Sequence, residues 1–311
     1  MSMARFARLV PLLREATAEA AWVQWHALGG QVAAREPTAI VDPEALILVS
    51  LWLKDDEPRF WDLLAGFAQL GSRLLSVQRM QRLVSAFPPL SDERLAVFAQ
   101  TVARTPGDSR WRRLAGPAPA RPTTGRRGKV AAPALRLARP GALLLRLRTA
   151  FGVDVRTDAL AYLLGRGGAP ATVGEVADAL GYADNTVRGA CDALTAARLA
   201  SVGPSRPARY HTSVERWGRL LGQAAMPRWH PWWQGFAVAL SLTGWLQSRE
   251  ARAASGAAAS TLARGWMHEH RAPLAALRIE VPDLRDSPGE AFLPVFESTV
   301  ESLAAWLRTS A

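Results

Sequence analysis

The sequence predicts a mainly helical protein with one short β-hairpin near its middle. Three observations predict this fold class. Apolar residues recur at helical spacing over most of the chain, helix-capping residues stand where these runs begin, and one pair of β-like segments surrounds a Gly-Pro tip. Of the 311 residues, 49% are hydrophobic and 21% are charged, as is typical of folded globular proteins. This composition excludes a disordered chain, a collagen-like repeat and a coiled-coil rod.

Residues 1–106 are expected to form an N-terminal helical bundle. Gly29-Gly30 ends a first predicted helix, and Asp42 is a typical N-cap for a second that has Pro43 at its first position. Pro58 opens a third helix, and Pro88-Pro89 closes a fourth. The predicted helices cover residues 14–28, 44–54, 58–67, 77–87 and 91–102.

Residues 107–140 are predicted to be a linker rich in proline, glycine and arginine. From residue 109 to residue 148 the chain has eleven basic residues and no acidic one, and Arg126, Arg127 and Lys129 lie at its centre. The other 27 basic residues balance the 27 acidic ones, so this segment carries the whole formal excess of +11. Such a segment attracts polyanions by counterion release. Nucleic acid is the commonest partner of this kind; an anionic membrane and a solvated linker are the alternatives.

Residues 141–213 are expected to form a central domain of short helices and a hairpin. A helix over 157–164 precedes a second helix over 173–180, for which Thr172 and Glu175 form a capping box and Gly181 is the stop. Asp184 is the expected cap of a third helix, which runs to about residue 197. In that helix Val187, Cys191 and Leu194 are spaced four and three residues apart, which predicts one buried stripe. Residues 199–202 and 209–212 are the predicted strands of the hairpin.

The order of these elements resembles the winged helix-turn-helix domains of MarR- and ArsR-type bacterial transcription regulators. The resemblance is carried by Thr172–Gly181, by Asn185-Thr186-Val187-Arg188 and by Leu194 with Arg198-Leu199-Ala200, and it covers residues 157–213 only. It implies that the third helix lies in the major groove of DNA. It further implies that base edges are contacted from the start of that helix, and that phosphates or the minor groove are contacted from the hairpin. The residues expected to make these contacts are Asn185, Thr186, Arg188 and Gly189 on the helix, and Arg206 and Arg209 on the hairpin.

The resemblance therefore predicts sequence-specific binding to double-stranded DNA by a transcription regulator, such as a repressor, acting as a homodimer. Residues 157–213, however, contain five basic and five acidic residues. Either the preceding basic segment supplies the electrostatic attraction, or the module docks a protein partner in a defence or toxin–antitoxin assembly. RNA binding is less favoured, because Tyr162, Tyr182 and Tyr210 are the only aromatic residues of the module.

Residues 214–311 are predicted to be a C-terminal helical domain that contains seven of the twelve tryptophans. Aromatic residues at helical spacing usually form a core, and a pocket for a small-molecule or protein effector is the alternative. The uncharged run 232–246 is about 22 Å long as a helix, which is too short to span a membrane, so a buried helix is expected.

The sequence offers no motif for an enzyme, a cofactor or a metal, and none of these is expected. His268-Glu269-His270 is the only histidine cluster, and its spacing of two fits a solvated helix end better than a metal site. Cys191, the single cysteine, is expected to be a buried, inert thiol. The first residues contain no signal-peptide pattern, which predicts a cytoplasmic protein.

Overall fold

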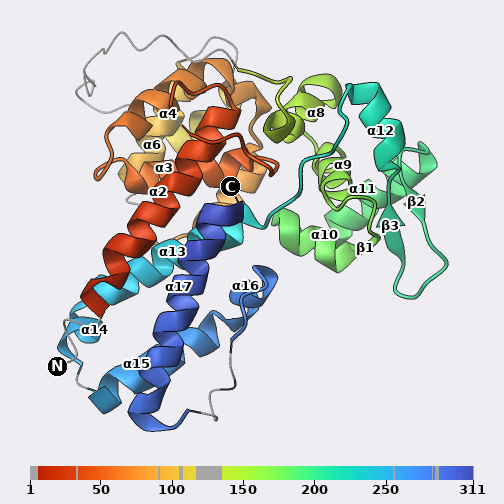
Figure 1. The fold of residues 1–311 in the computed structure, drawn as a ribbon. Helices are drawn as coiled ribbons and strands as arrows, with labels where there is room; N and C mark the ends of the chain where they lie inside the picture. The colour runs from red at the N-terminus through yellow and green to blue at the C-terminus, as the bar shows by residue number, and fades with distance from the viewer. Residues whose placement is uncertain are drawn as a thin grey trace. The chain divides into compact units, whose positions relative to one another are not determined.

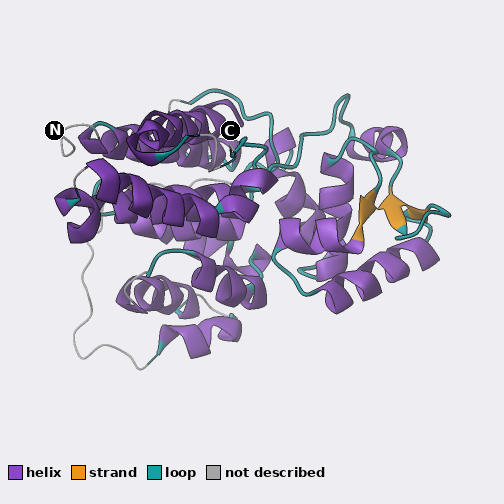
Figure 2. Ribbon diagram, turned by 90° about the horizontal axis from the view of Figure 1, so that it is seen from below, coloured by secondary structure: helices purple, strands orange, loops and turns teal. Residues whose placement is uncertain are grey.

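The computed structural model describes residues 6–32, 34–89, 92–104, 108–116, 135–254, 256–281, 283 and 287–310 (Figure 1). Over these residues the protein is mainly helical, with one small antiparallel sheet, so the predicted helical class is confirmed (Figure 2). The chain divides into two compact units. Residues 1–22, 86–88 and 231–311 form the terminal unit, and residues 23–85 and 89–230 form the central unit. This division crosses the four parts predicted from the sequence, because the central unit contains residues from each of them.

The first half of the central unit consists of helices, most of which begin within one residue of the predicted start. These are α3 (Pro43–Leu53), α4 (Arg59–Leu70), α5 (Val77–Leu83), α6 (Asp92–Ala103) and α7 (Arg112–Ala115), preceded by α2 (Leu9–Ala27), which is shared with the terminal unit. Asp42 Oδ1 accepts from the Ala45 N–H at the start of α3, as expected. Helix α2 begins five residues earlier than predicted, because Pro11 lies in its first turn, where no backbone N–H is needed.

Short 3₁₀ turns replace parts of the predicted regular elements. The predicted helix over 77–87 is α-helical only to Leu83 and continues as a 3₁₀ turn. The 3₁₀ segments are η1 (Ser72–Leu74), η2 (Val84–Ala86), η3 (Ser109–Trp111), η4 (Pro140–Ala142) and η5 (Gly289–Ala291).

The second half of the central unit contains the helices and the hairpin that the sequence predicted for residues 141–213. Its elements are α8 (Leu143–Phe151), α9 (Val155–Gly165), β1 (Ala171–Thr172), α10 (Val173–Leu180), α11 (Asp184–Ala196), β2 (Ser201–Val202), β3 (Arg209–His211) and α12 (Val214–Leu221). The capping box of Thr172 and Glu175 is present, and Gly181 ends α10 in the left-handed conformation at φ 70°. Ala183, rather than the predicted Asp184, is the N-cap of α11; Asp184 lies in the first turn of the helix instead.

The sheet has the order β1-β3-β2 and is antiparallel throughout. Tyr210 of β3 pairs with Ala171 on one side and with Val202 on the other. Strand β1 was not predicted, because two residues carry too little alternation to be read as a strand. Tyr210 is buried, and it joins the sheet to the apolar core formed by α8 to α12.

The terminal unit is a tryptophan-rich assembly of helices. It contains α13 (Trp232–Gln247), α14 (Arg249–Ala253), α15 (Gly256–Glu269), α16 (Arg271–Ala276) and α17 (Phe292–Ser310). The buried helix predicted over 232–246 is confirmed, since most residues of α13 are buried. No helix among the described residues is both long and apolar enough to cross a membrane. His268 and Glu269 are exposed, as predicted, whereas His270 is half-buried: its ring stacks on Trp266, with the centroids 4.1 Å apart, and contacts Ser241 Oγ.

Candidate functional site

Helix α11 has one apolar face and one exposed polar face. Its buried residues are Val187, Ala190, Cys191 and Leu194, which extends the predicted stripe by one alanine. On the opposite side Asn185, Thr186, Arg188 and Gly189 are all exposed. We call these four residues the α11 face. The helical period places the four residues for which base contacts were predicted on the solvent side of α11.

Gly189 has no structural reason to be glycine. It lies inside α11 with a helical φ, and a Cβ added there would meet no atom within 4 Å. Glycine inside a helix costs about 0.5–1 kcal/mol relative to alanine. The absence of a side chain at this position leaves the backbone of α11 open to close approach from outside.

The hairpin of β2 and β3 places its two predicted arginines differently. Arg206 is exposed at the tip. Arg209 lies on β3, where its Nη1 is 3.6 Å from Glu175 Oε2, and both side chains are nearly half exposed. The backbone N–H of Thr172, followed by the Thr172 side chain and Arg209, holds the pKa of Glu175 below its ordinary value. Arg209 is therefore partly engaged by a surface carboxylate, and among the described residues Arg188 and Arg206 form no hydrogen bond or ion pair.

The hairpin is tied to α11 by one polar contact. Tyr210 Oη donates to Asp192 Oδ1 at 2.9 Å. Burial, together with the neighbouring Asp192 carboxylate, raises the pKa of Tyr210 above its ordinary value, so the phenol keeps its proton. This contact fixes β3 against α11 one helical turn after Arg188, and it leaves the negative charge of Asp192 next to the α11 face.

Part of the basic segment serves the fold. Arg110 donates to both carboxylate oxygens of Asp108 and to the carbonyl oxygens of Ser72 and Leu75. Arg139 donates to the His26 carbonyl oxygen at 2.5 Å, and Arg148 is fully buried. These three arginines of the basic segment are therefore engaged within the fold. Arg126, Arg127 and Lys129 lie outside the described residues.

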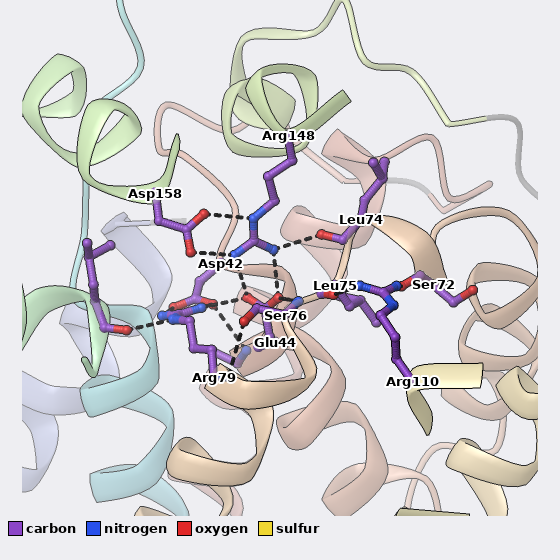
Figure 3. Close-up of polar contacts among 12 residues, drawn as sticks. Asp42, Glu44, Ser72, Leu74, Leu75, Ser76, Arg79, Arg110, Arg148 and Asp158 are labelled. Carbon is purple, nitrogen blue, oxygen red and sulfur yellow. Dashed lines mark hydrogen bonds and ion pairs between the residues drawn. The ribbon is translucent and has the colours of Figure 1, made fainter. Parts of the chain in front are cut away.

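A buried cluster of charged side chains lies between α3, α5, α8 and α9 (Figure 3). We call it the charge cluster, and its members are Asp42, Glu44, Arg79, Arg148 and Asp158, each at most 1% exposed. Arg79 donates from Nη1 and Nη2 to the two oxygens of Asp42, at 2.5 and 2.6 Å. Arg148 donates from Nε and Nη2 to the two oxygens of Asp158, both at 2.8 Å. Glu44 accepts from both arginines, with Oε2 2.7 Å from Arg79 Nη1 and Oε1 2.6 Å from Arg148 Nη1.

Glu44 and the two arginines of the charge cluster stay ionised despite their burial. Desolvation raises the pKa of Glu44, but the guanidinium groups of Arg148 and Arg79 outweigh it and hold that pKa below its ordinary value. Burial lowers the pKa of each arginine, and the adjacent carboxylates more than offset this, so both guanidinium groups stay charged. Every carboxylate is paired and none is exposed, so the cluster offers no accessible group for substrate chemistry. Removal of one partner would leave a buried charge uncompensated, which costs a fold about 3–5 kcal/mol.

Sequence reasoning missed the charge cluster. Asp42 and Glu44 fit the start of a helix, and Arg148 falls in the basic segment. Arg148 directly follows the largely apolar run Leu143–Leu147, and Asp158 directly precedes the apolar run Ala159–Leu164. The sequence therefore places a charge beside each run but does not show that either side chain is buried.

The remaining candidate groups are isolated. Burial, with a smaller contribution from Asp192, raises the pKa of the Cys191 thiol to about 11, which keeps it protonated. No group of three or more potential metal ligands occurs among the described residues. The chain matches no protein-family model, no curated protein and no solved structure.

Proposed function

We propose that this protein binds double-stranded DNA through the α11 face and the β2–β3 hairpin, and that it regulates transcription. In this proposal α10, α11 and the sheet form a winged helix-turn-helix like that of the MarR- and ArsR-type regulators. The observation that carries the proposal is the division of α11 into a fully buried apolar face and an exposed face with Asn185 and Arg188, whose side chains are the commonest readers of adenine and guanine.

The dimensions of α11 suit this role. Its 13 residues give a rod about 20 Å long, and the major groove, about 12 Å wide, accepts such a helix. In the proposed complex Arg188 donates two hydrogen bonds to a guanine, Asn185 pairs with an adenine, and the bare backbone at Gly189 allows close contact. Arg206 contacts phosphates or the minor groove beside the site. A homodimer on a two-fold symmetric operator is the default geometry for such modules.

The electrostatic attraction is assigned to the basic segment, since the module is neutral. A salt titration tests this assignment. We expect purified protein to bind duplex DNA with an affinity that falls steeply with salt, and we expect replacement of Arg126, Arg127 and Lys129 by glutamine to weaken binding to every sequence and to flatten the salt dependence. A slope that is unchanged in the triple variant would remove the basic segment from the interface.

One observation favours a second function, the docking of a protein partner. Asp184 and Asp192 are exposed on α11 beside the residues proposed to read bases, and both would face phosphates unfavourably. A chain that shows no salt-sensitive binding to a random duplex pool, but binds one protein in a manner that requires Arg188, supports this alternative.

A further inference from the structure

We propose that Tyr182 and Arg79 are positioning residues, through which helix α5 sets the orientation of α11. This inference rests on the proposed function, because it concerns how the same α11 face is aimed. It assigns a specific role in DNA binding to a helix that was predicted to belong to a separate N-terminal bundle.

The turn between α10 and α11 is held from outside at two points. Tyr182 lies in this turn, where its Oη donates to Asp158 Oδ2 at 3.0 Å and lies 3.2 Å from Ser76 Oγ. Leu180 is the last residue of α10, and its carbonyl oxygen accepts from Arg79 Nε at 2.6 Å. Ser76 and Arg79 both belong to the first turn of α5, since the Arg79 N–H donates to the capping Ser76 Oγ. The start of α5, together with Asp158 of α9, therefore holds both the end of α10 and the turn that leads into α11.

These contacts are buried and directional. Arg79 is fully buried, Tyr182 is 7% exposed and Ser76 is 8% exposed. Burial, followed by the Asp158 carboxylate, raises the pKa of Tyr182 well above its ordinary value, so the phenol remains a donor. The apolar stripe of α11 packs the helix against the core. Apolar contacts have no preferred direction, so this packing alone tolerates small rotations of the helix. Buried hydrogen bonds are directional and select one orientation of α11, and a recognition helix needs a defined orientation to contact base edges.

Arg79 extends this control into α3. The same guanidinium group that holds Leu180 is bound by Asp42, the N-cap of α3, and by Glu44 in the first turn of that helix. The Arg79 guanidinium group therefore links the end of α10 to the start of α3, and a movement of α5 would disturb its hydrogen bonds to both. Any partner or ligand that shifts α5 or α3 would therefore change the orientation of α11, even if that partner or ligand does not itself contact DNA.

The single cysteine provides a readout that does not depend on DNA. Cys191 lies on the buried face of α11 and is fully buried, so a thiol-specific reagent reaches it only when α11 moves away from the core. We compare Tyr182→Phe, which removes one hydroxyl, with the control Ser50→Ala. Ser50 also forms buried hydrogen bonds in the central unit, accepting from Trp25 Nε1 at 2.9 Å and donating to the Leu46 carbonyl oxygen at 2.7 Å, and both partners lie outside α10 and α11.

With urea curves used to correct for global stability, we expect Tyr182→Phe to raise the labelling rate of Cys191 about tenfold, as for the loss of one buried hydrogen bond. We expect a similar loss of affinity for the selected duplex, and neither change in Ser50→Ala. Equal labelling rates in the two variants would overturn the proposal. If the wild-type chain does not bind duplex DNA, the proposed function fails, while the labelling experiment still decides the positioning role.

Arg79→Lys provides a second variant in case Tyr182→Phe fails to fold. It keeps a positive charge for Asp42 and Glu44 and removes the Nε donor to Leu180. We expect faster Cys191 labelling in this variant as well, with the circular dichroism of the folded protein unchanged. A labelling rate equal to that of the wild type would show that α5 does not control the turn.

Discussion

Arginine has opposite roles in two regions of the central unit. In the charge cluster Arg79 and Arg148 are completely buried, and each is held by two carboxylates. On α11 and the hairpin Arg188 and Arg206 are exposed and pair with no other described residue. A count of basic residues therefore does not measure affinity for polyanions, because the partners of each arginine decide whether its charge is available.

The largest expected effect is the loss of a buried arginine. Arg148→Ala leaves Glu44 and Asp158 buried with an uncompensated charge, and we expect the free energy of unfolding to fall by about 3–5 kcal/mol. Urea denaturation measures it. Arg188→Ala is the matched control, for which a change within about 0.5 kcal/mol is expected, since the side chain is exposed. Equal losses in the two variants would erase the distinction between the two regions.

Acid should weaken the charge cluster before it affects the α11 face. The folded state holds the pKa of Glu44 below its ordinary 4.5, so its stabilising contribution is complete above that pH and is lost as the pH falls below it. Urea denaturation between about pH 7 and pH 3 should show this decline. Glu44→Gln should be less stable at neutral pH and should lose less stability on acidification. A pH dependence as steep as that of the wild type would assign the effect to other carboxylates.

The next effect concerns binding alone. In the proposed complex Arg188→Ala should cost about 1–3 kcal/mol on the preferred duplex and should relax the preference at one base pair. Fluorescence anisotropy with the preferred duplex and with a random duplex measures both. Equal losses on the two duplexes would show that Arg188 contacts phosphate instead of a base.

The smallest expected effect has opposite signs for folding and binding. Gly189→Ala should raise the free energy of unfolding by about 0.5–1 kcal/mol, because the added Cβ meets open space in a helix. The same methyl group should weaken duplex binding if the backbone of α11 approaches DNA closely. Thermal unfolding and anisotropy on one sample test both, and a stabilised variant with unchanged affinity would place Gly189 outside the interface.

Local chemistry made much of the fold predictable. The capping box at Thr172, the stop at Gly181 and the buried stripe of α11 depend on residues within a few positions of one another, so they are visible in the sequence. The exposed position of Arg188 follows from the same periodicity. The two-residue strand β1 has no such local signal, because it is defined by its pairing with β3, almost forty residues later.

The charge cluster could not be assembled from the sequence for the same reason. Arg148 meets Glu44 across 104 residues, and Arg79 meets Leu180 across 101. The pattern places Arg148 beside an apolar run, but it cannot show that the side chain is buried or identify the carboxylate that compensates it. The stacking of His270 on Trp266 is local, four residues apart, yet it depends on the packing of α13 against this pair through Ser241.

The members of the charge cluster are far apart in the sequence, which affects both the synthesis of the chain and the choice of fragments. A ribosome that has released only the first hundred residues has delivered Glu44 and Arg79, while Arg148, Asp158 and the Leu180 carbonyl are still to be synthesised. At that stage Arg79 is the single guanidinium group for the two carboxylates Asp42 and Glu44, and the second guanidinium group arrives only with Arg148. A fragment cut at residues 141–213 would keep the pair of Arg148 and Asp158 but would lose Glu44 and Arg79, so we expect it to be less stable than the whole central unit.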